Sequence, residues 1–70
     1  MQQTYTAVVE QNQGNWIGWI EEVPGVSCQE ATRDELLASL RITLAEAIEF
    51  NRAEARGAAG TGYEELAIAV

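Results

Sequence analysis

The stretch from Ile20 to Leu40 constrains the fold of this chain more than any other part of its sequence. An apolar segment runs into the dipeptide Pro24-Gly25, and a short extended piece and an amphipathic segment follow it. Proline has no amide hydrogen for a strand ladder and glycine permits a tight turn, so this dipeptide is expected to end a strand. The order of strand, corner, short strand and helix indicates a small α+β domain.

Two strands are expected before that corner. Residues 4–11 alternate along the chain, and residues 15–23 carry bulky apolar side chains on both faces. The intervening residues 12–15 tolerate positive φ, so the first 23 residues are expected to contain a β-hairpin. Gly18 lies inside the second strand, where a glycine often marks a close backbone approach. We expect this glycine to let a crossing helix sit near the sheet.

A capped helix is predicted over about residues 33–55. Thr32 and Glu35 fit a capping box, in which the threonine hydroxyl accepts from the Glu35 amide and the glutamate carboxylate reaches back. The apolar positions of the helix recur on one stripe: Leu37, Leu40, Leu44, Ala47 and Ile48. A helix unbroken to Arg56 is ~36 Å long, whereas a seven-residue strand spans ~23 Å. The turns after about Asn51 are therefore expected to overhang the sheet or to fray.

The remaining segments complete a predicted β-β-β-α-β order in a single domain. Residues 26–30 are expected to form a short edge strand. Residues 63–70 are expected to form a fourth strand, with Leu66, Ile68 and Val70 on one face. A helix between two strands of one sheet usually makes a right-handed crossover, which gives the spatial order 3-2-1-4. One helix then covers one face of the sheet, and nothing in the sequence remains to cover the other.

That uncovered face predicts a second polypeptide. An exposed apolar patch of several hundred Å² is unusual in a soluble monomer, and a core of this size contributes only about 3–5 kcal/mol of net stability. Cys28 is the single cysteine, so a disulfide within one molecule is excluded. We expect a homo-oligomer, a dimer or tetramer, formed through the sheet face or through a strand edge, or else a permanent heteropartner.

The charge balance narrows the classes of partner. Eleven carboxylates face four arginines, lysine is absent, and the net charge is −7. This balance disfavours direct nucleic-acid binding, because a nucleic-acid-binding surface needs cations to neutralise phosphates. It suits a basic protein partner. The alternative is that the carboxylates only form a solvated acidic surface. No signal peptide and no apolar run of ~20 residues is visible. With the lone thiol, this predicts a cytoplasmic protein with no membrane segment.

The sequence predicts no enzyme and no catalytic, cofactor or metal site. Histidine is absent, and the neighbouring Glu21 and Glu22 point to opposite faces of a strand, so they form no acid–base pair. Cys28 has no basic neighbour in sequence and cannot build a zinc site alone. Trp16 and Trp19 have the rings to stack on bases, but packing is the favoured interpretation for so acidic a chain.

Several segments, in their order along the chain, resemble the HicB-like antitoxin family. They are Tyr5-x-Ala-Val-Val-Glu10, Trp16-Ile-Gly-Trp-Ile20, Glu22-Val-Pro-Gly25 and Thr32-x-Asp-Glu35, followed by a Leu-rich helix. The resemblance covers about residues 3–51. It implies a partial ribonuclease H-like fold and a partner of the HicA type, a small basic toxin that cleaves messenger RNA. Many members also carry a DNA-binding domain, and none is expected here because only one strand is predicted after the helix.

Two functions follow as expectations. The first is a HicB-like antitoxin module that binds and neutralises a HicA-like toxin, with Trp19 and Val23 as apolar anchors. Four carboxylates at the strand end and the helix start would engage the toxin: Glu21, Glu22, Asp34 and Glu35. The alternative is an orphan HicB-like homo-oligomer, a structural or interaction protein without a cognate toxin.

Overall fold

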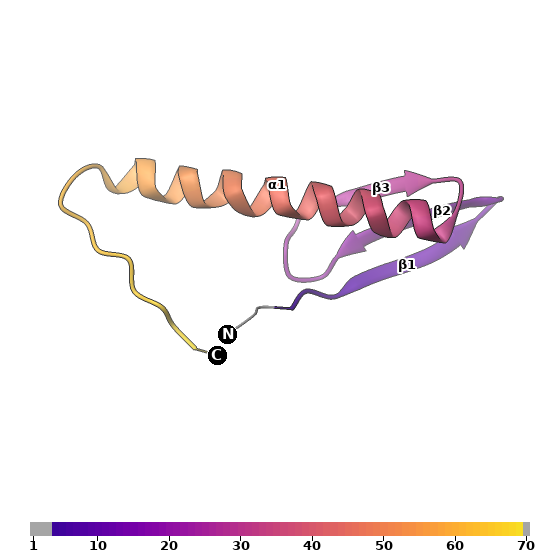
Figure 1. Ribbon diagram of the computed structural model, residues 1–70, viewed down its shortest axis with the longest axis horizontal. Helices are drawn as coiled ribbons and strands as arrows, with labels where there is room; N and C mark the ends of the chain where they lie inside the picture. Colours follow the sequence, from indigo (N-terminus) through magenta and orange to yellow (C-terminus); the bar gives the residue numbers. More distant parts are fainter. Residues whose placement is uncertain (1–3, 70) are drawn as a thin grey trace.

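The computed structural model describes residues 4–69 and places three strands before one long helix (Figure 1). The strands are β1 (Ala7–Asn12), β2 (Asn15–Ile20) and β3 (Ser27–Glu30), and the helix α1 spans Arg33–Ala59. β2 pairs antiparallel with both neighbours, so the sheet order is β1-β2-β3. α1 lies across one face of this sheet, against β2 and β3. The chain is therefore a two-layer α+β domain.

Two turns set the path of the sheet. Gln13 and Gly14 have φ angles of 53° and 84°, so the β1–β2 hairpin closes with a two-residue loop whose twist matches that of the strands. After β2, the chain turns through residues 21–26, and the Ile20 amide donates to the Val26 carbonyl at 3.2 Å. The Pro-Gly corner predicted from the sequence thus separates β2 from β3.

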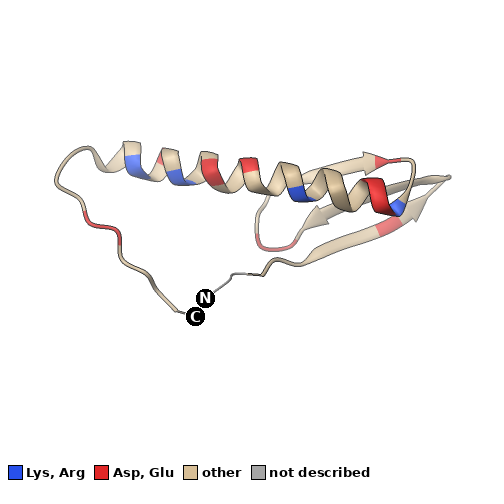
Figure 2. Cartoon of the chain, in the orientation of Figure 1, with Lys and Arg blue, Asp and Glu red and all other residues tan. Residues whose placement is uncertain are grey.

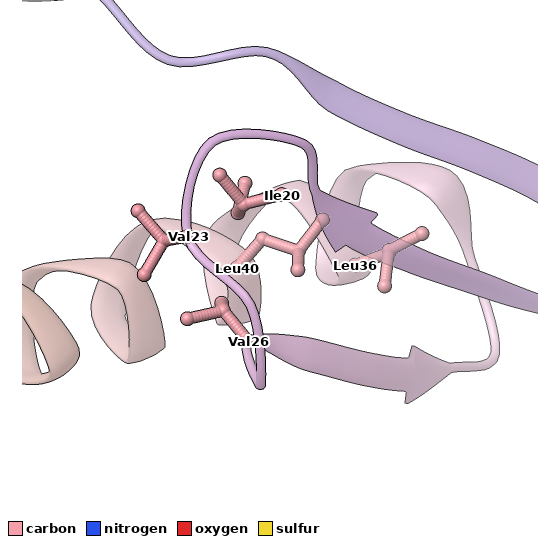
Figure 3. Close-up of a cluster of buried hydrophobic side chains, with 5 residues drawn as sticks. All are labelled: Ile20, Val23, Val26, Leu36 and Leu40. Atoms are coloured by element: carbon pink, nitrogen blue, oxygen red, sulfur yellow. The ribbon is translucent and has the colours of Figure 1, made fainter.

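The core lies between α1 and the sheet. Five buried apolar side chains form it, as Figure 3 shows: Ile20, Val23, Val26, Leu36 and Leu40. A Cβ atom built on Gly18 would lie 3.0 Å from Leu40 Cδ1 and 3.1 Å from Leu36 Cδ2. It would also lie 3.0 Å from the carbonyl oxygen of Val8. The close approach predicted at this glycine is confirmed, and it identifies the face of the sheet that the helix covers.

The start of α1 has the predicted cap, with one difference. The Glu35 amide donates to the Thr32 hydroxyl at 3.2 Å, as expected. The Glu35 carboxylate accepts from the same hydroxyl at 2.9 Å. A third hydrogen bond joins the two layers: the Ser39 hydroxyl of α1 donates to the Glu30 carboxylate of β3 at 2.7 Å. Together these bonds fix where the helix starts relative to the end of β3.

The predicted fourth strand and the order 3-2-1-4 are wrong. Residues 63–69 form no strand and run as exposed chain beyond α1, and Val70 lies outside the described residues. The length of α1 gives the reason. Its 27 residues extend ~40 Å, about twice the ~20 Å of a six-residue strand. The helix continues through Gly57 and ends only at Ala59, before Gly60 with a φ of 73°.

Truncation of Leu40 tests the assignment of the core. Leu40→Ala should lower the free energy of unfolding by about 2–5 kcal/mol, because it removes a fully buried side chain from the contact with β2. Ile42→Ala is the matched control, since Ile42 lies on the same helix and is 61% exposed. Urea unfolding measures both. A Leu40→Ala variant as stable as the parent would show that α1 does not pack through this residue.

Substitution of Gly18 tests the close approach of the helix. Gly18→Ala should destabilise the fold by about 1–3 kcal/mol, because one of the crowded atoms is the backbone oxygen of Val8, which has little freedom to move. Gly57→Ala places the same methyl group on α1 where no atom lies within 4 Å, and it should stabilise the helix by up to about 1 kcal/mol. Thermal melts that move in the same direction for both variants would contradict this account.

Candidate protein-binding surface

The face of the sheet turned away from α1 is uncovered within the described residues; we call it the open sheet face. Strand alternation places Val8 of β1 and Ile17 and Trp19 of β2 on this face, opposite the helix-facing Gly18. Val8 is the cross-strand neighbour of Trp19. Trp19 is 39% exposed, and the other two side chains are half-buried. The three side chains form one apolar strip across two strands.

The arginines of the molecule are confined to one of its two layers. All four arginines lie on α1: Arg33, Arg41, Arg52 and Arg56. Residues 4–32, which form the sheet and its turns, contain carboxylates and no cation (Figure 2). Glu10 lies on the open sheet face beside Ile17, and Glu21 directly follows β2. A partner that approaches this face meets an apolar centre with negative charge at its margins.

The structure separates the predicted partner-binding carboxylates into two groups. Glu21 and Glu22 lie at the corner that follows β2, whereas Asp34 and Glu35 lie in the first turn of α1. β3 runs from the first group toward the second, so the groups are at opposite ends of the sheet. All four residues are exposed. They do not form one acidic cluster, and their contact with a partner stays a prediction.

The two predicted apolar anchors differ in exposure. Trp19 is available on the open sheet face, whereas Val23 is only 9% exposed and packs beside Ile20 in the core. Figure 3 shows Val23 on the corner loop, among the side chains that meet the helix. Strand geometry ends at Ile20, so strict alternation does not extend to this valine. Its burial is explained within the chain, and its predicted contact with a partner stays a prediction.

Val8 and Ile17 were not among the residues expected to bind. The sequence indicated which residues share a face: Thr6, Val8 and Glu10 lie on one side of their strand, and Ile17 lies on the same side of its strand as Trp19. What the sequence alone could not show is which face of the sheet the helix covers. The contact of α1 with Gly18 decides this, and it places the apolar strip on the exposed side.

Glu22 fixes the chain where it enters β1. Its carboxylate oxygen Oε1 accepts a hydrogen bond from the Thr6 amide at 2.7 Å. The neighbouring Glu21 amide donates to the Thr6 carbonyl at 2.9 Å. The hydrogen bond from the Thr6 amide lowers the pKa of the Glu22 carboxyl, because it favours the charged form. The margin of the open sheet face is therefore held in place by a charged group.

Cys28 is a half-buried side chain that packs against the core. Its Sγ lies 3.5 Å from the Thr43 hydroxyl of α1.

Across residues 4–69, no group of three or more His, Cys, Asp or Glu side chains is placed to hold a metal ion. In the same part of the chain, no helix combines the length and the apolar character needed to cross a membrane.

Comparison with protein-family models, with curated proteins and with solved structures finds no match to this chain. The resemblance to the HicB-like family stays a prediction from the quoted segments. The open sheet face and the distribution of charge are therefore the features of the molecule that bear on its function.

Acid is expected to remove the contribution of Glu22 to stability. Its pKa is lower in the folded state than the ordinary value of 4.5, so the contribution is fully present above that value and is lost as the pH falls through the folded pKa. Urea unfolding of the parent and of Glu22→Gln should differ at about pH 7, and the difference should shrink as the pH falls below 4.5. Glu21→Gln, with the same charge change one residue away, is the control. A difference between parent and Glu22→Gln that stays the same over this range would contradict the assigned hydrogen bond.

Proposed function

We propose that this chain is a HicB-like antitoxin module that binds and neutralises a small basic toxin of the HicA type. The open sheet face carries the proposal. Its apolar strip around Trp19 has no cover, and the flanking Glu10 and Glu21 are not neutralised by any cation of the sheet layer. A basic protein with an apolar centre buries Trp19 and brings its own cations to these carboxylates.

The exposed surface of the chain supports a permanent partner. The chain exposes 5776 Å², whereas a compact protein of its mass exposes about 4,300 Å². Each partner in a stable complex loses about 800 Å² to the interface. The difference of about 1,500 Å² from the compact case shows that this chain leaves more surface in contact with water than a compact monomer does.

The location of the charges supports a protein partner over a nucleic acid. Phosphate binding depends on cations, and the layer that contains the exposed tryptophan has none. Trp19 also lies within an apolar strip with Val8 and Ile17, which is suited to side-chain packing. We place the module in the cytoplasm as part of the proposal, because Cys28 is a free thiol.

An orphan homo-oligomer without a toxin is the second candidate. The surface excess favours it equally, because a second copy covers apolar surface as well as a toxin does. The exposed Leu66 and Ile68 favour the homo-oligomer specifically. They lie beyond α1, away from the open sheet face, so a toxin bound to that face leaves them uncovered.

Co-expression with a basic neighbour tests the proposal. The tagged chain is produced together with the product of a small basic reading frame adjacent to its gene. The expected result is a complex that survives purification and in which the partner no longer cleaves RNA. Recovery of homo-oligomers alone, with the partner active and unbound, would reject the antitoxin function in favour of the orphan oligomer.

Two variants locate the contact. Trp19→Ser and Glu21→Arg should each weaken the complex at least about tenfold, which corresponds to ~1.4 kcal/mol of binding free energy. Ile42→Ser and Glu54→Arg make comparable changes at exposed positions of α1 and should leave affinity unchanged. Titration calorimetry measures all four. Equal losses in the sheet and helix variants would place the toxin elsewhere on the molecule.

A further inference from the structure

A second uncovered surface lies between β1 and α1. The helix packs on β2 and β3, and it leaves an open groove of about 590 Å³ beside the start of β1. The groove is lined by Tyr5 and Ala7 from the sheet layer and by Leu37, Leu40 and Leu44 from α1, with Arg41 beside these leucines. Among the described strands β1 pairs only with β2, so its outer edge carries no strand. β1 contains neither proline nor lysine, the residues that commonly prevent an edge from accepting a further strand.

The C-terminal segment, residues 63–69, is built to occupy such a groove. It is extended, and its Leu66 and Ile68 are 77% and 86% exposed. Alternation places Glu64 on the same side as these two residues. The segment therefore presents an apolar side with one carboxylate at its beginning.

Charge makes the groove and the segment complementary. Arg41 is exposed at the groove wall and has no ion pair within 4 Å among residues 4–69. The Glu64 carboxylate lies on the same side of the segment as Leu66 and Ile68. Its neighbour Glu65 lies 3.7 Å from Arg56 of the same chain, which leaves Glu64 for the groove.

The segment is carried away from the groove of its own chain. α1 begins at one end of the sheet and extends ~40 Å, so its second half lies ~20 Å beyond the strands. A return over that distance uses about six extended residues, which corresponds to residues 60–65 after the end of α1. Figure 1 shows the segment running back from α1 and stopping short of β1.

The elongated shape of the chain points the same way. Its radius of gyration is 15.2 Å, whereas a compact chain of this length has a value of about 11 Å. The last turns of α1 and the segment after it extend beyond the strands of the sheet. This part of the molecule is placed to contact a second molecule.

We propose that the groove between β1 and α1 binds the C-terminal segment of a second copy of this chain, and that the exchange is reciprocal across a two-fold axis. Leu66 and Ile68 of one copy enter the apolar groove of the other, and Glu64 pairs with Arg41. The groove lies on the helix side of the sheet, so the dimer leaves the open sheet face free.

Substitutions on the two sides of the segment test the docking. Sedimentation equilibrium of the full chain should show a dimer for the parent. The double variant Leu66→Asp/Ile68→Asp should be monomeric, and Ala67→Asp, which alters the opposite side of the same segment, should remain dimeric. Circular dichroism checks that each variant is folded. A parent that is monomeric throughout, or a dimer that survives the double substitution, overturns the proposal.

A charge exchange tests whether the segment docks in a second copy. Arg41→Glu and Glu64→Arg should each raise the dimer dissociation constant at least tenfold, because each homodimer then opposes like charges at both grooves. An equimolar mixture should regain a heterodimer, since both of its grooves again pair opposite charges. Native mass spectrometry identifies the mixed species. Docking within one chain, or an interface elsewhere, predicts no recovery on mixing, and that result rejects the exchange.

Discussion

The contact of Leu36 and Leu40 with Gly18 determines how α1 lies on the sheet. A Cβ atom at this position would crowd both leucines and the backbone oxygen of Val8, so glycine lets the helix approach this closely without displacing its neighbours. The two leucines are then fully buried between the layers. The helix is centred on β2 and β3 as a result, and it covers neither the space along β1 nor the opposite face of the sheet.

The two uncovered surfaces differ in chemistry. The open sheet face combines the apolar strip around Trp19 with carboxylates alone, whereas the groove along β1 combines apolar walls with the cation Arg41. The first surface suits a basic partner, and the second suits an acidic and apolar segment such as the one that contains Glu64. A seventy-residue core contributes only a few kcal/mol, so ligands that cover these surfaces add stability by mass action.

Local signals in the sequence predicted the elements, and the longer-range arrangement did not follow from them. The capping residue Thr32, the Pro-Gly corner and the close approach at Gly18 depend on neighbouring residues or on one contact, and the structure has all three. The fourth strand failed because alternation in residues 63–69 shows β propensity but not access to a strand edge. The helix continues past Gly57, so the segment after it starts too far from β1.

The same distinction holds for the candidate site. The sequence placed Trp16 and Trp19 on opposite faces of one strand, but the exposure of Trp19 follows only from the contact of α1 with Gly18 on the other face. The separation of Glu21 from Asp34 did not follow, because it depends on the direction in which β3 runs. Val23 lies in the core because the chain leaves strand geometry at Ile20, and an alternation pattern carries no information beyond that point.

Thermal unfolding of the purified chain as a function of its concentration tests most directly whether these surfaces belong to an assembly. The account predicts that the melting temperature rises steadily over a hundredfold increase in concentration, because association stabilises the folded subunit by mass action. An unchanged melting temperature over that range, together with a monomeric mass, would show that the chain is stable with both surfaces in water and would contradict the account.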